Sequence, residues 1–369
     1  MSLSLKKSST EPHTDFSIKN KKLHVFIAGI GAVGGTLTKL IKGLDHQQFE
    51  VNIIGVCNSK FTKWHPDIDY ITNGKKLKEG EPTDWNSIPD ELVDRNEGNL
   101  IFVDATGSEV VAHQYQHLLN HGVHIATPSK RANTFGQDYF DHLIKANNSG
   151  KAQYRYETAV GAGLPVISTI KTLLNSGDEI TEISGVASGT MTFLFTQLQN
   201  GIPFSEAVRK AKEGGYSEPD PRDDLSGEDV ARKFLILART CGYTFERNQI
   251  RVDTLVPEKL ISYSIEDFLE HLPDYDSHWK SRNAQALVNN RKLRYVGKFT
   301  PEGIAVGVEE VKGDSPLANL KGTDNLLQIY TKRYSESPIV VQGPGAGRDV
   351  TAAGVLGDII DIGGFIKEN

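Results

Sequence analysis

A glycine-rich segment near the start of the chain constrains its fold more than any other feature. The residues GIGAVG place Gly29, Gly31 and Gly34 between an apolar run at 23–29 and a helical pattern that extends to about residue 44. In a strand–turn–helix, the first glycine allows the tight turn, the second lets a pyrophosphate approach the backbone, and the third lets helix and strand pack closely. The spacing therefore predicts a dinucleotide-binding unit rather than a turn without a ligand.

The alternation of strands and helices continues to residue 157. Further β-branched runs lie at 51–57, 99–106, 122–127 and 153–158, with helical patterns at 113–122 and 138–147 between them. Strands that alternate with helices form a parallel, doubly wound sheet. The stretch 58–98 is too long for a bare loop, so we expect a small helix at 84–95.

After residue 157 the pattern changes to that of a mixed sheet. Strand-like runs lie at 180–188, 291–300, 303–311, 325–334 and 338–343, and helical patterns lie at about 190–200, 204–213 and 227–240. The short link 300–303 predicts a hairpin, so this sheet is at least partly antiparallel. A last helix follows a second glycine-rich loop.

These patterns predict α/β architecture: a Rossmann-type doubly wound parallel sheet and an α+β domain with a mixed, partly antiparallel sheet. We expect a disordered tail over residues 1–22, because this segment is polar throughout. The dinucleotide-binding domain would span 23–157 together with the C-terminal helix region 345–369. The domain that binds substrate and carries catalysis would span 158–344.

The composition excludes several kinds of partner. A formal net charge of −6 weighs against nucleic acid or an anionic membrane, because both require basic patches. With only Cys57 and Cys241, the chain has neither a disulfide framework nor a cysteine-based zinc site, which favours a reducing cytoplasm. No secretory signal is present, and no apolar run approaches the roughly 20 residues that span a bilayer.

The residues that follow the second strand bear on the choice of cofactor. Asn58, Ser59 and Lys60 stand where a carboxylate would bind the ribose 2′-hydroxyl of NAD. A lysine beside two hydrogen-bonding side chains suits a 2′-phosphate better, so NADP(H) is favoured and NAD remains possible. The alternative is that Lys60 is a solvated loop lysine. Ala32 and Val33 complete the loop that would contact the phosphates.

A charged segment, EPDPRDDLSGEDVARK at 218–233, leads directly into the apolar run 234–238. Ser226 is a good N-cap, and Asp229 three residues later predicts a capping-box-like pair. Asp229 and Lys233 are neighbours on such a helix. An exposed pair of this kind contributes only about 0.2–0.5 kcal/mol. The adjoining apolar run instead predicts a partly buried lysine, which is suited to proton transfer.

The loop before this helix and a second helix start offer sites for an amino-acid-like ligand. Glu218 and Asp224 lie on a proline-stiffened loop and suit an α-ammonium group. Free N–H groups at Gly189 and Thr190 would suit an α-carboxylate. An ordinary capped core helix explains 188–201 equally well. A cationic acid, carboxylates for an amine and a nearby nicotinamide together describe the reduction of an amino-acid aldehyde.

These motifs resemble the homoserine dehydrogenase family, from about residue 23 to the C-terminus. The resemblance is carried by GIGAVGG, ATPSKRAN, YETAVGAGLPVI, SGTMTFLF, GYSEPDPRDDLSGEDVARK and GPGAGRDVTAAGVLGD. It implies the reversible NAD(P)H-dependent reduction of L-aspartate 4-semialdehyde to L-homoserine, on the route to threonine, methionine and isoleucine. It also implies a homodimer formed through the sheet of the second domain.

The resemblance further implies roles for individual residues. Lys233 would exchange a proton with the substrate oxygen, Asp229 would orient the substrate and the lysine, and Lys130 would supply a second cationic group near nicotinamide and substrate. Glu218 and Asp224 would bind the amino-acid end of the substrate.

Two further groups of residues follow from the resemblance. Thr106 and Gly347 would contact the cofactor. A monovalent cation such as Na⁺ would be held by Glu157, Val160, Ala162 and Leu164, because backbone carbonyls and a carboxylate are suitable hard oxygen ligands.

Two other functions stay open on the residues alone. One is a different NAD(P)-dependent dehydrogenase of an amino-acid-like carbonyl substrate, and the other is a non-catalytic NADP-binding module. Neither requires Glu218, Asp224, Asp229 and Lys233 together. His113, His117 and His121 recur at helical spacing, but no cysteine or carboxylate cluster accompanies them, so we expect a solvated helix face rather than a metal site.

Overall fold

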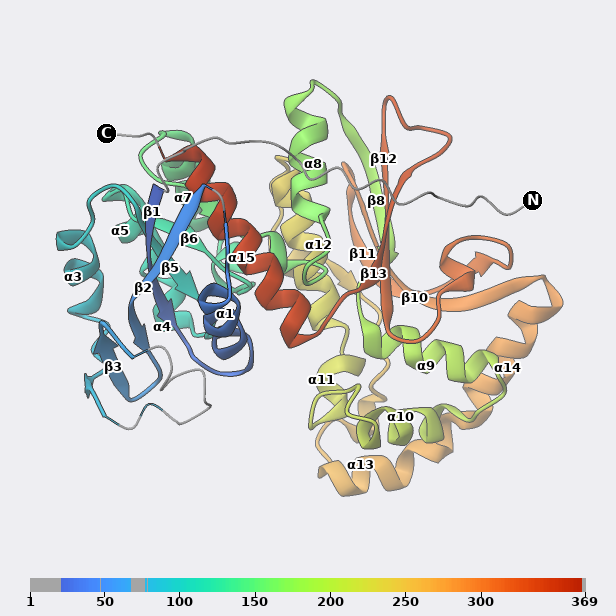
Figure 1. The fold of residues 1–369 in the computed structure, drawn as a ribbon. Helices are drawn as coiled ribbons and strands as arrows, with labels where there is room; N and C mark the ends of the chain where they lie inside the picture. The colour runs from blue at the N-terminus through green and yellow to red at the C-terminus, as the bar shows by residue number, and fades with distance from the viewer. Residues whose placement is uncertain (1–20, 47, 68–76, 78, 367–369) are drawn as a thin grey trace, which may run out of the picture.

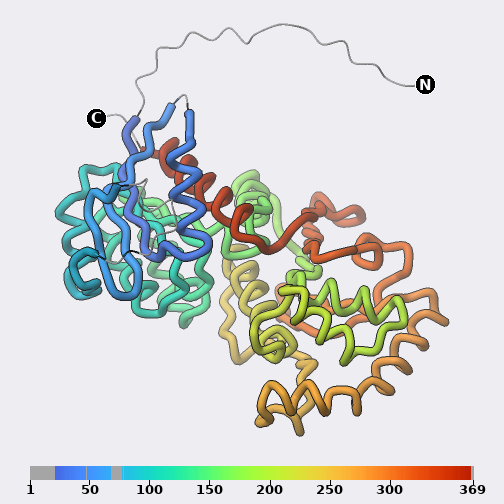
Figure 2. The backbone as a smooth tube through the Cα atoms, turned by 60° about the horizontal axis from the view of Figure 1, so that its bottom comes forward, coloured from blue at the N-terminus to red at the C-terminus, as the bar shows by residue number. Residues whose placement is uncertain are grey.

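A computed structural model of the chain describes residues 21–46, 48–67, 77 and 79–366. Within this part of the chain, two lobes lie side by side (Figures 1 and 2). The expected tail at 1–22 falls outside the described residues except for Lys21 and Lys22. Both belong to the first strand, where they pair with Phe49 and Glu50, so this strand begins earlier than the apolar pattern indicated.

The first lobe is built on a seven-stranded sheet in the order β4-β3-β2-β1-β5-β6-β7. Its strands are β1 (Lys21–Ala28), β2 (Phe49–Cys57), β3 (Phe61–Trp64), β4 (Glu81–Pro82), β5 (Leu100–Asp104), β6 (His124–Ala126) and β7 (Tyr154–Arg155). β1, β2, β5, β6 and β7 run parallel, whereas β3 and β4 add an antiparallel edge. The predicted doubly wound sheet is confirmed, and the antiparallel edge was not foreseen.

Helices cover both faces of this sheet, which is why β5 is buried along its whole length. They are α1 (Ala32–Lys42), α3 (Ile88–Asp94), α4 (Glu109–Ala112), α5 (Tyr115–Asn120), α6 (Arg131–Thr134) and α7 (Gln137–Asn148). The last helix, α15 (Arg348–Phe365), returns from the second lobe and packs along α1 (Figure 1). Its buried residues join the apolar core around β1.

The second lobe is built on a six-stranded sheet in the order β13-β12-β8-β10-β11-β9. Its strands are β8 (Ile180–Val186), β9 (Arg251–Val252), β10 (Arg291–Thr300), β11 (Gly303–Lys312), β12 (Asp324–Thr331) and β13 (Ile339–Pro344). Neighbouring strands are antiparallel except β9, which lies parallel to β11. The hairpin predicted at 300–303 joins β10 to β11, so the expected mixed sheet is confirmed.

The helices of the second lobe are α8 (Val166–Asn175), α9 (Gly189–Gln199), α10 (Phe204–Glu213), α11 (Pro221–Leu225), α12 (Glu228–Thr240), α13 (Ile265–His271) and α14 (Asp276–Val288). Short 3₁₀ turns lie at Glu157–Ala159, Arg247–Gln249, Glu258–Leu260, Leu272–Tyr275 and Leu317–Asn319. α9, α12 and α14 all pack on β10. α12 therefore has one side in the core of the second lobe and its beginning near the junction of the lobes (Figure 1).

None of the helices within the described ranges combines the length and apolar character needed to cross a bilayer.

Candidate active site

The glycine-rich loop joins β1 to α1 in a tight turn that leaves the start of the helix open. Gly29 has a φ of +87°, and a Cβ on Gly34 would lie 1.9 Å from the Gly29 carbonyl oxygen, so only glycine allows this close packing. A Cβ on Gly31 would meet nothing within 4 Å. Gly31 is the N-cap of α1, whose first turn has neither a side-chain cap nor an acidic residue. The open N-terminus of α1 is thus free to bind an anion.

The end of β2 lies beside this loop, because the Gly29 N–H donates to the Cys57 carbonyl at 2.8 Å. Asn58 follows, and its Oδ1 accepts hydrogen bonds from the N–H groups of Lys60 and Phe61. Asn58 therefore shapes the turn, while Ser59 and Lys60 are exposed at its tip. The structure brings these residues next to the glycine loop, as a contact with the cofactor ribose would require.

Thr106 reaches the same loop from the end of β5. Its backbone N–H and hydroxyl both donate to Asp104 Oδ1, at 2.8 and 2.6 Å, and its methyl group lies 2.9 Å from where a Cβ of Gly29 would be. Burial raises the pKa of Asp104, while the hydrogen bonds from Thr106 and Tyr115 oppose that shift. Asp104 was not singled out from the sequence, and it fixes Thr106 in place.

The pair on α12 is held at the junction of the lobes. Only 8% of Lys233 is exposed, because the apolar run after it is buried in the second lobe. Its Nζ lies 2.8 Å from Asp229 Oδ2 and donates to the Ala187 carbonyl at 2.6 Å. Lys233 is therefore a buried ammonium group with two fixed acceptors, and the pair is more than a solvated helix contact.

Lys130 brings a second ammonium group to the same carboxylate from the first lobe. It lies between β6 and α6, and its Nζ is 3.3 Å from Asp229 Oδ1. Burial opposes ionisation of Asp229, but the charges of Lys233 and Lys130 outweigh it and hold the pKa of Asp229 well below its usual range. Burial also lowers the pKa of Lys130, and Lys233 adds to this shift while Asp229 counteracts it.

The start of α12 differs from the prediction. The N-cap is Gly227, with a φ of +77°, and a Cβ there would lie 1.9 Å from the Tyr295 hydroxyl. Ser226 ends α11 instead, where its hydroxyl donates to the Asp223 carbonyl at 2.8 Å and accepts from the Glu228 N–H at 3.2 Å. The predicted capping box is wrong, because a left-handed turn between two consecutive helices requires glycine.

Glu218 lies in a loop as predicted, but Asp224 lies in α11, because Pro221 begins a short helix there. The N–H of Glu218 donates to Asp224 Oδ2 at 2.8 Å, and the Glu218 side chain is exposed. Burial raises the pKa of Asp224, while the hydrogen bond from that N–H lowers it. A ligand cation would favour the ionised form of Asp224.

The beginning of α9 is partly capped by the protein itself. The Ser188 hydroxyl accepts from the Met191 N–H at 3.3 Å, and the Thr190 hydroxyl donates to the Tyr216 carbonyl at 2.6 Å. A Cβ on Gly189 would lie 2.8 Å from the Thr323 carbonyl oxygen, so this end of the helix packs tightly. The start of α9 is therefore explained as that of an ordinary capped core helix, without a ligand.

The loop expected to bind a monovalent cation uses its carboxylate in another way. The two carboxylate oxygens of Glu157 accept from the N–H groups of Ile167 and Ser168, each at 2.7 Å, and so cap α8. Val160 and Ala162 are buried, and Ala162 has a φ of +53°. No cluster of three or more His, Cys, Asp or Glu residues suited to a metal occurs in the described part of the chain. Backbone carbonyls of Val160, Ala162 and Leu164 are the donors that this loop could offer.

One cleft between the lobes collects most of the predicted catalytic and substrate residues. It is lined by Lys130, Ala162, Glu218, Asp224, Asp229, Lys233 and Gly347. Its lining also includes residues that the sequence did not single out: Arg131, Thr158, Arg232, Gly345, Ala346 and Thr351. Arg232 could have been found from its place in the charged segment, three residues after Asp229. Thr158 and Gly345 carry no comparable signal.

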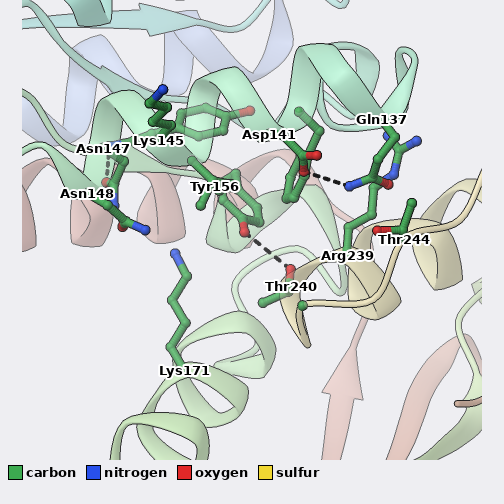
Figure 3. Close-up of a pocket in the computed structure, with 14 residues that line it drawn as sticks. Gln137, Asp141, Lys145, Asn147, Asn148, Tyr156, Lys171, Arg239, Thr240 and Thr244 are labelled. Atoms are coloured by element: carbon green, nitrogen blue, oxygen red, sulfur yellow. Dashed lines mark hydrogen bonds between the residues drawn. The ribbon is translucent and has the colours of Figure 1, made fainter.

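A second hollow lies at the same junction, between α7, β7, α8 and the end of α12 (Figure 3). Lys171 points into it, with Nζ 4.5 Å from the centre of the Tyr156 ring, and the Tyr156 hydroxyl lies 3.2 Å from the Thr240 hydroxyl. Its lining includes none of the residues predicted to bind substrate or cofactor.

His113, His117 and His121, the histidines at helical spacing, each contact a nearby group. The His113 ring stacks on Phe135 at 4.4 Å, His117 Nε2 lies 2.9 Å from Asp90, and His121 Nδ1 lies 2.8 Å from the His117 carbonyl. The His117 and His121 rings also lie against each other, with their centres 4.5 Å apart.

Comparisons with known proteins agree with this geometry. A family profile described as homoserine dehydrogenase matches residues 165–360, and one for the homoserine dehydrogenase NAD-binding domain matches 29–157. The chain is 38% identical to a homoserine dehydrogenase of Schizosaccharomyces pombe, with 94% of this chain and 96% of that protein covered. It is also 38% identical to the chloroplastic bifunctional aspartokinase/homoserine dehydrogenase 2 of Zea mays, over 96% of this chain. The chain spans only 40% of the length of this maize relative.

Solved structures resemble the whole two-lobed fold. A Candida auris protein of unknown function has a TM-score of 0.87 at 33% identity, with 94% of this chain and 99% of that chain covered. A hyperthermophilic archaeal homoserine dehydrogenase in complex with NADPH has a TM-score of 0.72 at 24% identity, with 93% and 98% covered.

A doubly wound sheet with an open glycine loop, joined to a mixed α+β lobe across a charged cleft, defines a class of two-domain proteins with a Rossmann-type NAD-binding domain. Within that class, the chain belongs to the homoserine dehydrogenase family.

Proposed function

We propose that this chain catalyses the reversible NAD(P)H-dependent reduction of L-aspartate 4-semialdehyde to L-homoserine. The observation that carries this proposal is the position of Asp229 between Lys233 and Lys130, in a cleft that also contains Glu218 and Asp224. Family membership supports the assignment of this reaction. The cleft supplies lysines for the aldehyde oxygen of the substrate and carboxylates for its α-ammonium group.

The nicotinamide cofactor, when bound, supplies the hydride. Lys233 gives a proton to the carbonyl oxygen of the aldehyde as negative charge grows there, and takes it back in the reverse direction. The Ala187 carbonyl and Asp229 hold its ammonium group in one position. Lys130 adds a second positive charge from the opposite lobe, which stabilises the same developing charge.

Glu218 and Asp224 would hold the α-ammonium group of the substrate. Glu218, in the loop before α11, donates its N–H to Asp224 in α11, and both residues lie in the same cleft as Lys233. Carboxylates that bind an ammonium group at one end of a substrate fix the distance at which its other end meets the lysine.

The cofactor would lie across the loop at Gly29–Gly34, with contacts from Thr106 and Gly347, and NADP is the favoured form. The open N-terminus of α1 fits a pyrophosphate, and the exposed Lys60 fits a 2′-phosphate. This assignment places the cofactor mainly on 23–157 and 345–369, and the substrate mainly on 158–344. An archaeal homoserine dehydrogenase of the same fold has been solved in complex with NADPH, which supports the choice of a nicotinamide cofactor.

Three finer points belong to the same proposal. A cation such as Na⁺ would bind the carbonyls of the 157–164 loop, and a titration of activity with Na⁺ tests this. The homodimer would form through the second sheet, which sedimentation velocity tests. A cytoplasmic location is supported by two free cysteine thiols, and cell fractionation tests it.

The decisive experiment compares Lys233→Ala with wild type in an assay of NADPH oxidation by aspartate semialdehyde. Loss of the proton donor should lower kcat by about 10²–10⁴-fold, because general acid–base catalysis contributes that much. The NADPH Kd should stay unchanged. Lys210→Ala, which removes an exposed i,i+4 pair with Glu206, is the matched control and should leave both quantities unchanged.

The outcomes separate the competing functions. Near-normal turnover of Lys233→Ala would exclude Lys233 as the proton donor. Faster turnover of another aldehyde by wild type would indicate a different dehydrogenase, and NADPH binding without any turnover would indicate a binding module. A lower KM for NADH than for NADPH would overturn the preference for NADP.

A further inference from the structure

A buried amide without partners lies next to the active-site cleft. Asn325, in β12, is 1% exposed, and neither its Oδ1 nor its Nδ2 has a hydrogen-bond partner within the described residues. Burying an amide without hydrogen bonds destabilises the folded protein, and native proteins rarely leave both ends of one unpaired. The arrangement therefore calls for an explanation that packing does not provide.

The amide lies directly against the second glycine-rich loop, residues 343–347, which comprises the end of β13 and the link to α15. A Cβ on Gly345 would be 1.8 Å from Asn325 Nδ2 and 1.9 Å from its Cγ, so only glycine fits there. Gly345 and Gly347 line the cleft together with Lys130 and Lys233. The peptide groups of this loop, which line the cleft proposed for the cofactor, therefore lie beside an amide whose donor and acceptor are both unpaired.

The loop has the freedom to turn toward this amide. Gly343 has a φ of +157° and Gly347 has a φ of +132°, and glycine moves readily among such conformations. An amide side chain can donate to one peptide carbonyl and accept from one peptide N–H at the same time. A rotation of the peptides between Gly345 and Gly347, which lie outside the β12–β13 ladder, would satisfy both groups.

We propose that Asn325 is a positioning residue for cofactor binding. Its amide engages the peptide groups of loop 343–347 only when the nicotinamide cofactor occupies the cleft beside Gly347. In the free protein the amide is unsatisfied, so its hydrogen bonds contribute to the bound state alone and raise the affinity for the cofactor. This inference rests on the proposed function.

The test uses Asn325→Leu and Asn325→Ala in the full chain, with Asn283→Leu as a matched control. Asn283 is also buried, but its Nδ2 donates to the Leu198 carbonyl at 3.0 Å. Tm is measured by calorimetry without ligand, and the NADPH Kd by titration calorimetry. We expect the Asn325 variants to keep or raise Tm and to weaken NADPH binding about tenfold or more, the loss of one or two hydrogen bonds. Asn283→Leu should lower Tm and leave the Kd unchanged.

The result that supports the proposal is weaker NADPH binding in both Asn325 variants while at least one keeps its Tm. An unchanged Kd in either variant, or a Tm that falls in both as in the control, overturns it. If wild type itself does not bind NADPH, the proposed function fails and this inference fails with it. If wild type binds NADPH and the variants bind equally well, only the role of Asn325 is lost.

Discussion

At the scale of single residues, burial and neighbouring charge set the chemistry of the ionisable groups. Asp229 is ionised because two lysines from different lobes outweigh the cost of its burial. Asp358, on α15, shows the opposite balance. Burial raises its pKa from 3.8 to about 8, the Glu157 carboxylate adds to this shift, and the N–H of Glu157 and the charges of Lys171 and Arg155 are too weak to reverse it.

Asp358→Asn should therefore stabilise the protein increasingly as the pH rises. Between about pH 4 and pH 8 the carboxyl is protonated in the folded protein and ionised in the unfolded chain. The folded state then binds the extra proton, so the free energy of unfolding falls as pH rises through this window and levels off above it. The amide removes this penalty, by at most about 1.4 kcal/mol per pH unit. Thermal unfolding of both proteins at several pH values measures the difference, and a difference that does not change with pH would contradict the expectation.

At the scale of elements, the glycines of the β1–α1 turn are needed for different reasons. One is required by the packing of the fold, and another is expected to make room for a ligand. Gly34 permits the contact between helix and strand, whereas Gly31 leaves space where a ligand would lie. This division was predicted from the spacing of the loop, because the strand and helix that flank it leave few alternative geometries. The N-cap of α12 was not predicted, since a serine in the expected position gives no sign that the next residue must adopt a positive φ.

The two loop glycines should respond differently to alanine. Gly34→Ala forces a methyl group against the Gly29 carbonyl and should lower the free energy of unfolding by about 1–3 kcal/mol or more. Gly31→Ala should leave stability within about 1 kcal/mol, the helix-propensity difference, yet weaken NADPH binding. Chemical denaturation and NADPH titration of both variants measure these effects. Equal NADPH affinity in Gly31→Ala and wild type would argue against a pyrophosphate at this turn.

At the scale of the whole molecule, α12 joins the lobes at both of its ends. Asp229 near its start pairs with Lys130 of the first lobe, and Arg239 near its end donates to the carbonyls of Asn133 and Phe135, at 2.8 and 2.6 Å. The Arg239 side chain is fully buried. The helix that carries Asp229 and Lys233 is thereby fixed to the domain that would carry the cofactor.

Arg239→Met should loosen this junction. It leaves buried carbonyl groups of both lobes without a donor, which should lower the free energy of unfolding by about 2–4 kcal/mol. Lys210→Met, at an exposed ion pair, should cost less than about 0.5 kcal/mol. Urea denaturation of the three proteins measures both values, and a similar small loss in the two variants would show that Arg239 does not secure the lobes.

The sequence by itself determined the two kinds of sheet, the glycine-rich turn between β1 and α1, the neighbouring positions of Asp229 and Lys233, and the family. These features depend on residue periodicity and on spacing within one element, which the order of residues records directly. Only the tertiary structure decided that Lys130 shares Asp229 with Lys233, that the Glu157 carboxylate caps α8, and that the Asn325 amide is left unpaired against Gly345. Each of these contacts joins segments that are distant in the sequence. Several partners are possible for each polar group, and the packing of the folded chain decides which of them it contacts.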